Sequence, residues 1–211
     1  MSGVTHWWWI RHAPVPGGGT RIFGRRDVDC DVSDARALRA LAAVLPRDAV
    51  GIVSSLKRTR QTYDALAEAG AALPQPIVEP DLAEQSFGLW EGLSWPEMEA
   101  ADPAIYSAFW ADPTRNAPPE GESYAAMLER VAAAIATLTA RHAGRDLVCV
   151  SHGGTIRAAV ATALSLAPET AMAIVIDNLT LTRISYVQGG LLRGRAGAWM
   201  IRGVNIPSRP L

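Results

Sequence analysis

The sequence of 211 residues predicts an α/β fold, a three-layer sandwich with a mostly parallel central sheet, followed by C-terminal β segments. Short apolar runs typical of strands alternate with longer segments in which apolar residues recur every three or four positions. Such alternation favours parallel strands with helices on both sheet faces. The first run, residues 7–10, is apolar throughout, as expected of a strand buried on both faces. The length favours one domain, residues 1–211.

The first predicted strand ends in a cation and an imidazole. Alternate side chains of residues 7–10 would point to opposite faces of the sheet. Arg11 and His12 follow, and Pro14 cannot continue the hydrogen-bond ladder. Open α/β sheets bind ligands at the carboxyl ends of their strands. Arg11 and His12 are therefore candidate ligand-binding residues, although a strand end that merely surfaces would also carry polar side chains.

The next elements are a loop, a helix and two strands. Gly17-Gly18-Gly19 lacks the Lys-Ser/Thr pair of a phosphate-binding loop, so we expect a flexible connection. Ser33-Asp34 is a typical helix N-cap, and Pro46 closes the helix that follows. Strands are predicted at residues 50–53 and 77–78, with a second helix between them.

The second half of the chain begins with a helical excursion at about residues 93–120. Its aromatic side chains either line a substrate pocket or pack as core, and Ser94 can cap a short helix within it. The elements predicted after it are a helix to about residue 141, a strand at 147–150, a helix at 156–166 and strands at 173–176, 178–187 and 197–202, with a turn at Gly189-Gly190. The terminal β segments either complete the sheet or pair across a homodimer.

Composition argues against several classes of partner. The formal net charge of -1 and the lack of a basic tract provide no attraction to nucleic acid or to a membrane surface. Cys30 and Cys149 lack the spacing of a metal or redox site. Neither a signal peptide nor an apolar stretch long enough to span a bilayer is visible, so we expect a cytoplasmic protein.

Polar residues follow three predicted strands and should meet at one edge of the sheet. They are Arg11 and His12, the segment from Ser54 to Arg58, and Ser151-His152-Gly153. Free amides at a helix N-terminus bind anions, and a guanidinium group matches phosphate oxygens. The sequence therefore predicts a site for a phosphate-bearing ligand at this edge.

Five segments also resemble, in order, the signatures of the histidine phosphatase superfamily, or phosphoglycerate mutase-like family. Arg11-His12-Ala13-Pro14 resembles its Arg-His-Gly signature, and residues 54–62 resemble its Ser-Pro-Leu-x-Arg-Ala-x-Gln-Thr segment. Residues 82–92 resemble its Glu-x-x-x-Gly-x-x-x-Gly region. Residues 121–123 and 151–157 resemble its later segments. The matches span about residues 7–157.

The resemblance implies a metal-independent phosphomonoesterase without a cofactor, acting on a small phosphorylated metabolite through a phosphohistidine. It makes His12 the nucleophile and Glu84 the general acid. Arg58 fits the family position better than Arg60, because it precedes the small residue Thr59. Phe23-Gly24 resembles the aromatic-Gly pair of the phosphatase branch. The substrate-binding residues that the resemblance implies are Arg11, Phe23, Gly24, Arg58, His152 and Gly153, and it counts Arg11, Arg58 and His152 as catalytic as well.

Two departures from the family pattern concern the phosphate site. Ala13-Pro14 replaces the common Gly followed by Glu or Thr. The Asn that family members often carry several residues after the nucleophile is absent, and Gly18 lies in that region. Thr20 or Arg21 is a candidate substitute for that contact. Residues 22–31 are weakly similar to α-ribazole phosphatase-like proteins.

Three alternatives stay open. Phosphoglycerate mutases resemble longer chains with a basic insertion, whereas Arg115 is the only basic residue of residues 92–120. A non-catalytic phosphate-ligand binder could use the same pocket. A metal hydrolase could use His12, His152 and either Asp27 or Glu84, but this set lacks a ligand pair on one helix.

Overall fold

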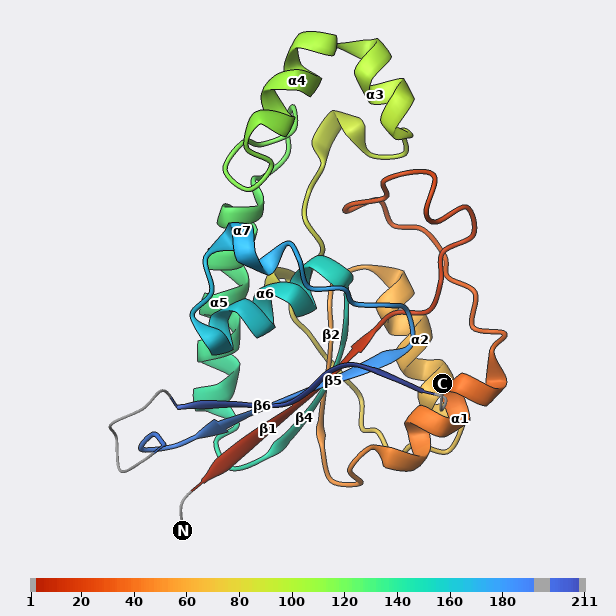
Figure 1. The fold of residues 1–211 in the computed structure, drawn as a ribbon. Coiled ribbons are helices and arrows are strands. Elements are labelled where there is room, and N and C mark those ends of the chain that lie inside the picture. The colour runs from red at the N-terminus through yellow and green to blue at the C-terminus, as the bar shows by residue number, and fades with distance from the viewer. Residues whose placement is uncertain (1–2, 192–197, 209–211) are drawn as a thin grey trace.

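The computed structural model describes residues 3–191 and 198–208, in which six strands form one mixed sheet (Figure 1). The sheet order is β3-β2-β4-β1-β5-β6. The strands are β1 (Val4–Arg11), β2 (Val50–Val53), β3 (Ile77–Val78), β4 (Asp146–Ser151), β5 (Thr180–Val187) and β6 (Trp199–Pro207). The first four strands are mutually parallel, whereas β5 runs antiparallel to both β1 and β6. The terminal β segments thus complete the sheet.

Helices cover both faces of the sheet, as predicted (Figure 1). One face carries α1 (Ala35–Val44) and α2 (Lys57–Glu68), and the other carries α5 (Tyr124–Arg141) and α6 (Gly153–Leu164). The shorter helices are η1 (Pro80–Leu82), η2 (Gly88–Trp90), α3 (Trp95–Ala101), α4 (Pro103–Ala111) and α7 (Pro168–Ala171). Within the described residues, no helix has the length and apolar character needed to cross a membrane.

The alternation along β1 determines which core each side chain joins. Trp7 and Trp9 stack with ring centroids 4.6 Å apart and pack with α5 and α6. Ile10 points to the opposite face and packs with α1 and α2. Burying such large side chains stabilises the fold by roughly 1.5–3 kcal/mol each. At its carboxyl end, Arg11 is paired with Ser151 of β4, so the polar ends of the two strands lie side by side.

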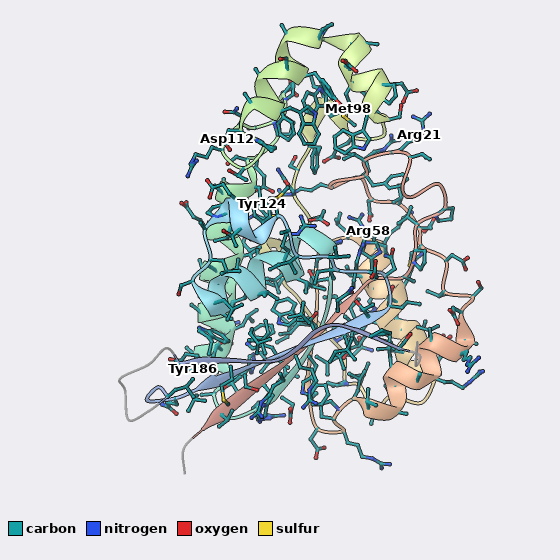
Figure 2. All side chains as sticks on the ribbon, in the orientation of Figure 1. Arg21, Arg58, Met98, Asp112, Tyr124 and Tyr186 are labelled. Atoms are coloured by element: carbon teal, nitrogen blue, oxygen red, sulfur yellow. The ribbon has the colours of Figure 1, made fainter. Side chains whose placement is uncertain are left out.

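The excursion at residues 93–120 projects beyond the carboxyl ends of the strands (Figure 1). Its helices α3 and α4 have a small core of their own, formed by Trp90, Met98 and Phe109. Ser94 caps α3 in a capping box with Glu97. Arg21 donates to Gly92 O and to Glu97, which ties the loop after β1 to this excursion (Figure 2). The excursion therefore lies beside the ligand-binding edge of the sheet.

The predicted strand at residues 173–176 is wrong, because this segment is irregular. Its carbonyl groups accept hydrogen bonds from arginine side chains, Ile174 O from Arg157 and Ile176 O from Arg11, instead of pairing with a strand. The helix expected from residue 156 begins at Gly153. The last strand extends beyond residue 202 to Pro207, and residue 197 of that prediction lies outside the described residues.

Candidate active site

A cavity of about 480 Å³ lies at the carboxyl edge of the parallel strands. It is bounded by the end of β1, the first turns of α2 and α6, the loop after β1, and residues 84–87. Seven of the eight predicted site residues line it, namely Arg11, His12, Phe23, Gly24, Arg58, Glu84 and Gly153. The eighth, His152, lies behind His12 and is fully buried.

His12 is a buried, neutral imidazole with a defined tautomer. Its Nδ1 lies 2.7 Å from Ala13 O, so Nδ1 carries the proton and donates it to this carbonyl. Nε2 is then an acceptor, and Arg58 Nε donates to it over 3.3 Å. Burial, and then the charges of Arg58 and Arg11, lower the pKa of His12 to about 3. At neutral pH, Nε2 is therefore unprotonated and carries the electron pair that a nucleophile requires.

Arg58 is held by backbone carbonyls of the loop after β1. Nη1 donates to Arg26 O and Nη2 to Gly24 O, both over 2.8 Å. Gly24 adopts a φ of 48°, and a Cβ atom there would lie 2.4 Å from Glu91 Oε1, so the position favours glycine. Arg60 instead lies on the exposed side of α2 and pairs with Asp64. The structure thus places Arg58 in the cavity and Arg60 outside it.

Arg11 lies against the first turn of α6. Its Nη1 donates to Ile176 O over 2.6 Å, and its buried Nε has no hydrogen-bond partner among the described residues. A Cβ atom on Gly153 would be 3.4 Å from the guanidinium carbon, so the two residues are in close contact. The guanidinium group and the amides of this helix N-terminus therefore converge on the cavity.

His152 packs edge-on against His12, with ring centroids 5.2 Å apart. Its Nε2 lies 2.7 Å from Ser54 Oγ, while its buried Nδ1 has no partner within the described part of the chain. Burial, followed by the charge of Arg58, lowers the pKa of His152 well below its usual value. His152 is therefore neutral, and its Nδ1 is a buried polar atom beside His12 that lacks a hydrogen-bond partner.

Glu84 extends over the N-terminus of α6. Oε2 accepts from Gly154 N over 3.2 Å, and Oε1 accepts from Gln85 N over 3.0 Å. A Cβ atom on Gly154 would lie 2.3 Å from Oε1, so a larger residue there would displace the carboxyl group. The carboxyl group and His12 line the same cavity.

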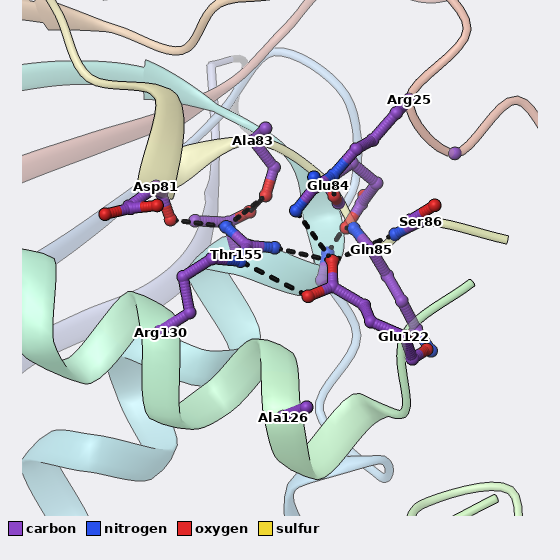
Figure 3. A network of polar contacts seen from close by, with 12 residues as sticks. Arg25, Asp81, Ala83, Glu84, Gln85, Ser86, Glu122, Ala126, Arg130 and Thr155 are labelled. Atoms are coloured by element: carbon purple, nitrogen blue, oxygen red, sulfur yellow. Dashed lines mark hydrogen bonds and ion pairs between the residues drawn. The ribbon is translucent and has the colours of Figure 1, made fainter. Parts of the chain in front are cut away.

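A network of polar contacts positions the segment that carries Glu84 (Figure 3). Arg130 on α5 donates to the carbonyls of Asp81 and Ala83 and pairs with Glu122. Glu122 in turn accepts from Ser86 N and from the Arg25 side chain. This network connects α5, residues 81–86 and the loop after β1. Glu122, from the Gly-Glu-Ser segment that resembles the family, is the carboxylate at its centre.

The family model of the histidine phosphatase superfamily (branch 1) matches residues 7–194. The chain belongs to this superfamily. Over 162 residues it is 31% identical to the metal-independent phosphoserine phosphatase of Arabidopsis thaliana, covering 74% of this chain and 68% of the relative. Over 168 residues it is 33% identical to the glucosyl-3-phosphoglycerate phosphatase of Mycolicibacterium vanbaalenii, covering 74% and 73%.

The fold is likewise similar to that of solved phosphatases. The crystal structure of the α-ribazole phosphatase from Shigella flexneri superimposes with a TM-score of 0.80, covering 95% of this chain and 96% of that one at 23% identity. At this identity the likeness concerns the fold. The resemblance to the superfamily is thus confirmed by the family model, and the fold is that of an α-ribazole phosphatase.

Sequence reasoning missed three polar cavity residues of this superfamily member. Asn178 Nδ2 donates to His12 O over 2.7 Å, which fixes the backbone of the nucleophile. Gln85 and Arg157 also line the cavity. Arg157 could have been found from the sequence, because it lies in residues 151–157, which resemble a family segment. Asn178 follows the incorrectly predicted strand and carries no local motif.

The two candidates for the missing family Asn differ in position. The Thr20 hydroxyl donates to Gly17 O, and the residue does not line the cavity. Arg21 does line it, but its guanidinium group pairs with Glu97. The asparagine that contacts the nucleophile is instead Asn178, whose side chain donates to His12 O and which was not among the two candidates.

The set proposed for a metal hydrolase is not assembled. Asp27 Oδ1 accepts from Lys57 N at the start of α2. Elsewhere in the described ranges, too, no three His, Cys, Asp or Glu side chains gather in a way that could hold a metal ion.

Proposed function

We propose that the chain is a metal-independent phosphomonoesterase that hydrolyses a small phosphorylated metabolite in the cytoplasm through a phosphohistidine at His12. The state of His12 carries this proposal. Its Nδ1 proton is held by Ala13 O, and its Nε2 electron pair lies beside the Arg58 guanidinium group. A neutral imidazole among cations is a nucleophile suited to a phosphoryl group.

In the first step, Arg11, Arg58 and the amides at the start of α6 bind the phosphoryl oxygens. His12 Nε2 attacks phosphorus, and the bond from phosphorus to the ester oxygen breaks. Glu84 donates a proton to the departing oxygen. The buried Nδ1 of His152 would find its missing partner in a phosphoryl oxygen. The positive charges of Arg11 and Arg58 stabilise the negative charge on the equatorial oxygens in the transition state.

In the second step, water replaces the alcohol product. Glu84, now a carboxylate, takes a proton from the water as its oxygen attacks phosphorus. The bond between phosphorus and Nε2 breaks, so neutral His12 and inorganic phosphate are released. The residue that donates a proton in one step thus accepts one in the next, which returns the enzyme to its initial state.

Hydrolysis is favoured over mutase activity by the excursion. Phosphoglycerate mutases of the family resemble longer chains with a basic insertion at this place. In this chain the basic residue of the excursion is Arg115, and its charge is already paired with Asp112 and Glu169. The A. thaliana and M. vanbaalenii relatives are also named as phosphatases. Both points support water as the final acceptor.

Rapid quenching during turnover of nitrophenyl phosphate tests the proposal. We expect acid-labile, base-stable phosphate on His12, located by mass spectrometry, and full activity after treatment with a chelator. His12→Ala should abolish both labelling and turnover, whereas Arg60→Ala should retain both. Near-normal turnover of His12→Ala, or inactivation by the chelator, would contradict the mechanism.

A further inference from the structure

The segment before β5, residues 176–179, is bound to the end of β1 at three points and is here called the clamp segment. The three contacts are Ile176 O with Arg11 Nη1 at 2.6 Å, Asn178 Nδ2 with His12 O at 2.7 Å, and Leu179 N with Arg11 O at 3.0 Å. Two main-chain carbonyls and one guanidinium group of the Arg-His pair are thus held by a part of the chain that is distant in sequence. The clamp segment therefore determines where the main chain of the nucleophile lies.

The clamp segment is not a relaxed stretch of chain. Leu179 has a φ of 53°, a left-handed conformation that residues other than glycine adopt at a cost. Such backbone strain persists only where the surrounding contacts enforce it, and it is concentrated at functional sites. Ile176 and Leu179 are buried, whereas Asp177 between them is exposed. The exposed part of the clamp segment therefore depends on polar contacts to keep its place.

Asn205, on the edge strand β6, supplies two of these polar contacts. Its side-chain Oδ1 accepts from Asp177 N over 2.7 Å, and its Nδ2 donates to Asp177 Oδ2 over 2.8 Å. A single side-chain amide thus binds both the main chain and the carboxylate of Asp177. Thr180 Oγ1 donates to Asp177 O over 2.7 Å from the other side. These contacts connect the edge of the sheet to the clamp segment.

The backbone of β6 is shaped to present this asparagine. The strand pairs that flank it are Leu181 with Ile206 and Arg183 with Gly203. In this interval β6 therefore contains one residue more than β5, which is a β-bulge. Bulges redirect side chains and are common next to active sites. Asn205 has a φ of 54°, which asparagine tolerates better than most residues. Both the bulge and the residue type thus favour the contact with Asp177.

We propose that Asn205 is a positioning residue for the nucleophile, which acts through Asp177 and the clamp segment on the backbone of Arg11 and His12. This inference rests on the proposed function. Asn205 does not line the cavity, so it would act only through these contacts. Phosphoryl transfer depends mainly on the alignment of the attacking atom with phosphorus. A small displacement of the His12 main chain would therefore slow the attack.

Asn205→Gly tests the inference, because glycine keeps the left-handed backbone without strain and removes the side chain alone. Rapid quenching with saturating nitrophenyl phosphate measures the rate constant at which phosphohistidine forms and the amount that forms. We expect the rate constant to fall about 10-fold, less than the roughly 100-fold cost of a 1 Å misplacement. A purely structural role would lower only the amount, because fewer molecules would be folded. Arg202→Gln, at an exposed position of β6, should match the wild type in both.

Two further variants test whether Asn205 acts through Asp177. Asp177→Ala should lower the rate constant as much as Asn205→Gly does, and the double variant should lose no more than either single variant. Asp177→Asn keeps an acceptor for Asn205 Nδ2 and should retain most of the rate constant. A wild-type rate constant in Asn205→Gly, or additive losses in the double variant, would overturn the inference. Failure of the wild type to form phosphohistidine would instead overturn the proposed function.

Discussion

Two buried, neutral histidines should make the protein sensitive to mild acid. The unfolded chain binds a proton at His12 near pH 6.5, whereas the folded chain does so only near pH 3. The neutral form therefore contributes its full stability above pH 6.5, and this contribution is lost as the pH falls from 6.5 towards 3. His152, whose pKa is also lowered, acts in the same direction.

The expected magnitude for His12 follows from the distance between the pH and its unfolded pKa. At pH 5 the solution is about 1.5 pH units below the pKa of His12 in the unfolded chain. Proton binding to the unfolded state therefore lowers the unfolding free energy by roughly 2 kcal/mol, at about 1.36 kcal/mol per unit. His12→Gln cannot titrate, so this part of the loss should disappear. The variant should therefore lose roughly 2 kcal/mol less than the wild type between pH 7 and pH 5.

Urea unfolding at pH 7 and pH 5, in buffers without phosphate, measures this difference. Tryptophan fluorescence and circular dichroism should give coincident transitions, so that free energies can be compared. Arg60→Gln, changed on the exposed side of α2, should show the full wild-type loss. If His12→Gln and the wild type lose the same free energy on acidification, His12 is not held neutral, and the basis for its nucleophilic role is removed.

Three further predictions concern the site and its support. Arg58→Ala should cost about 3 kcal/mol or more in kcat/KM and Arg60→Ala much less; the reverse order in steady-state kinetics would show that the segment is misaligned. Glu84→Gln should slow an alkyl phosphate about 100-fold but nitrophenyl phosphate far less, and equal losses would exclude the acid role. Arg130→Met removes one of the two cations paired with Glu122, together with the donor to the carbonyls of Asp81 and Ala83. It should lower the unfolding free energy by about 2 kcal/mol in urea titrations, as expected for lost hydrogen bonds to a charged group, whereas a loss below about 0.5 kcal/mol would show that the pair is solvated.

The sequence predicted the location of the site because the end of each strand can be recognised from local patterns. The apolar run at residues 7–10 identifies a central strand, and parallel pairing brings Arg11 beside Ser151. Any residue directly after such strands reaches the same edge. For this reason the cavity residues that follow β1, β2 and β4 could be located without an alignment.

Residues positioned by contacts distant in sequence were not predictable in this way. Glu84 is held by Gly154 N, 70 residues away, so only the family resemblance singled it out. The apolar segment at residues 173–176 looked like a strand, but its carbonyls bind Arg11 and Arg157. His152 does not line the cavity surface, because it packs edge-on against His12 as a fully buried side chain. A local pattern contains no information on such partners.

Ala13 replaces the glycine that follows the nucleophile in the family signature, and this replacement is compatible with a nucleophilic His12. The proton on His12 Nδ1 is held by the main-chain carbonyl of Ala13, and any residue at this position supplies such a group. The neighbouring peptide, between His12 and Ala13, is fixed from both sides, since Ala13 N donates to Thr62 and Asn178 donates to His12 O. The tautomer of His12 is therefore set by backbone geometry and by side chains distant in sequence. The Ala13 side chain itself is fully buried, so replacing the family glycine fills space without changing the group that orients the imidazole.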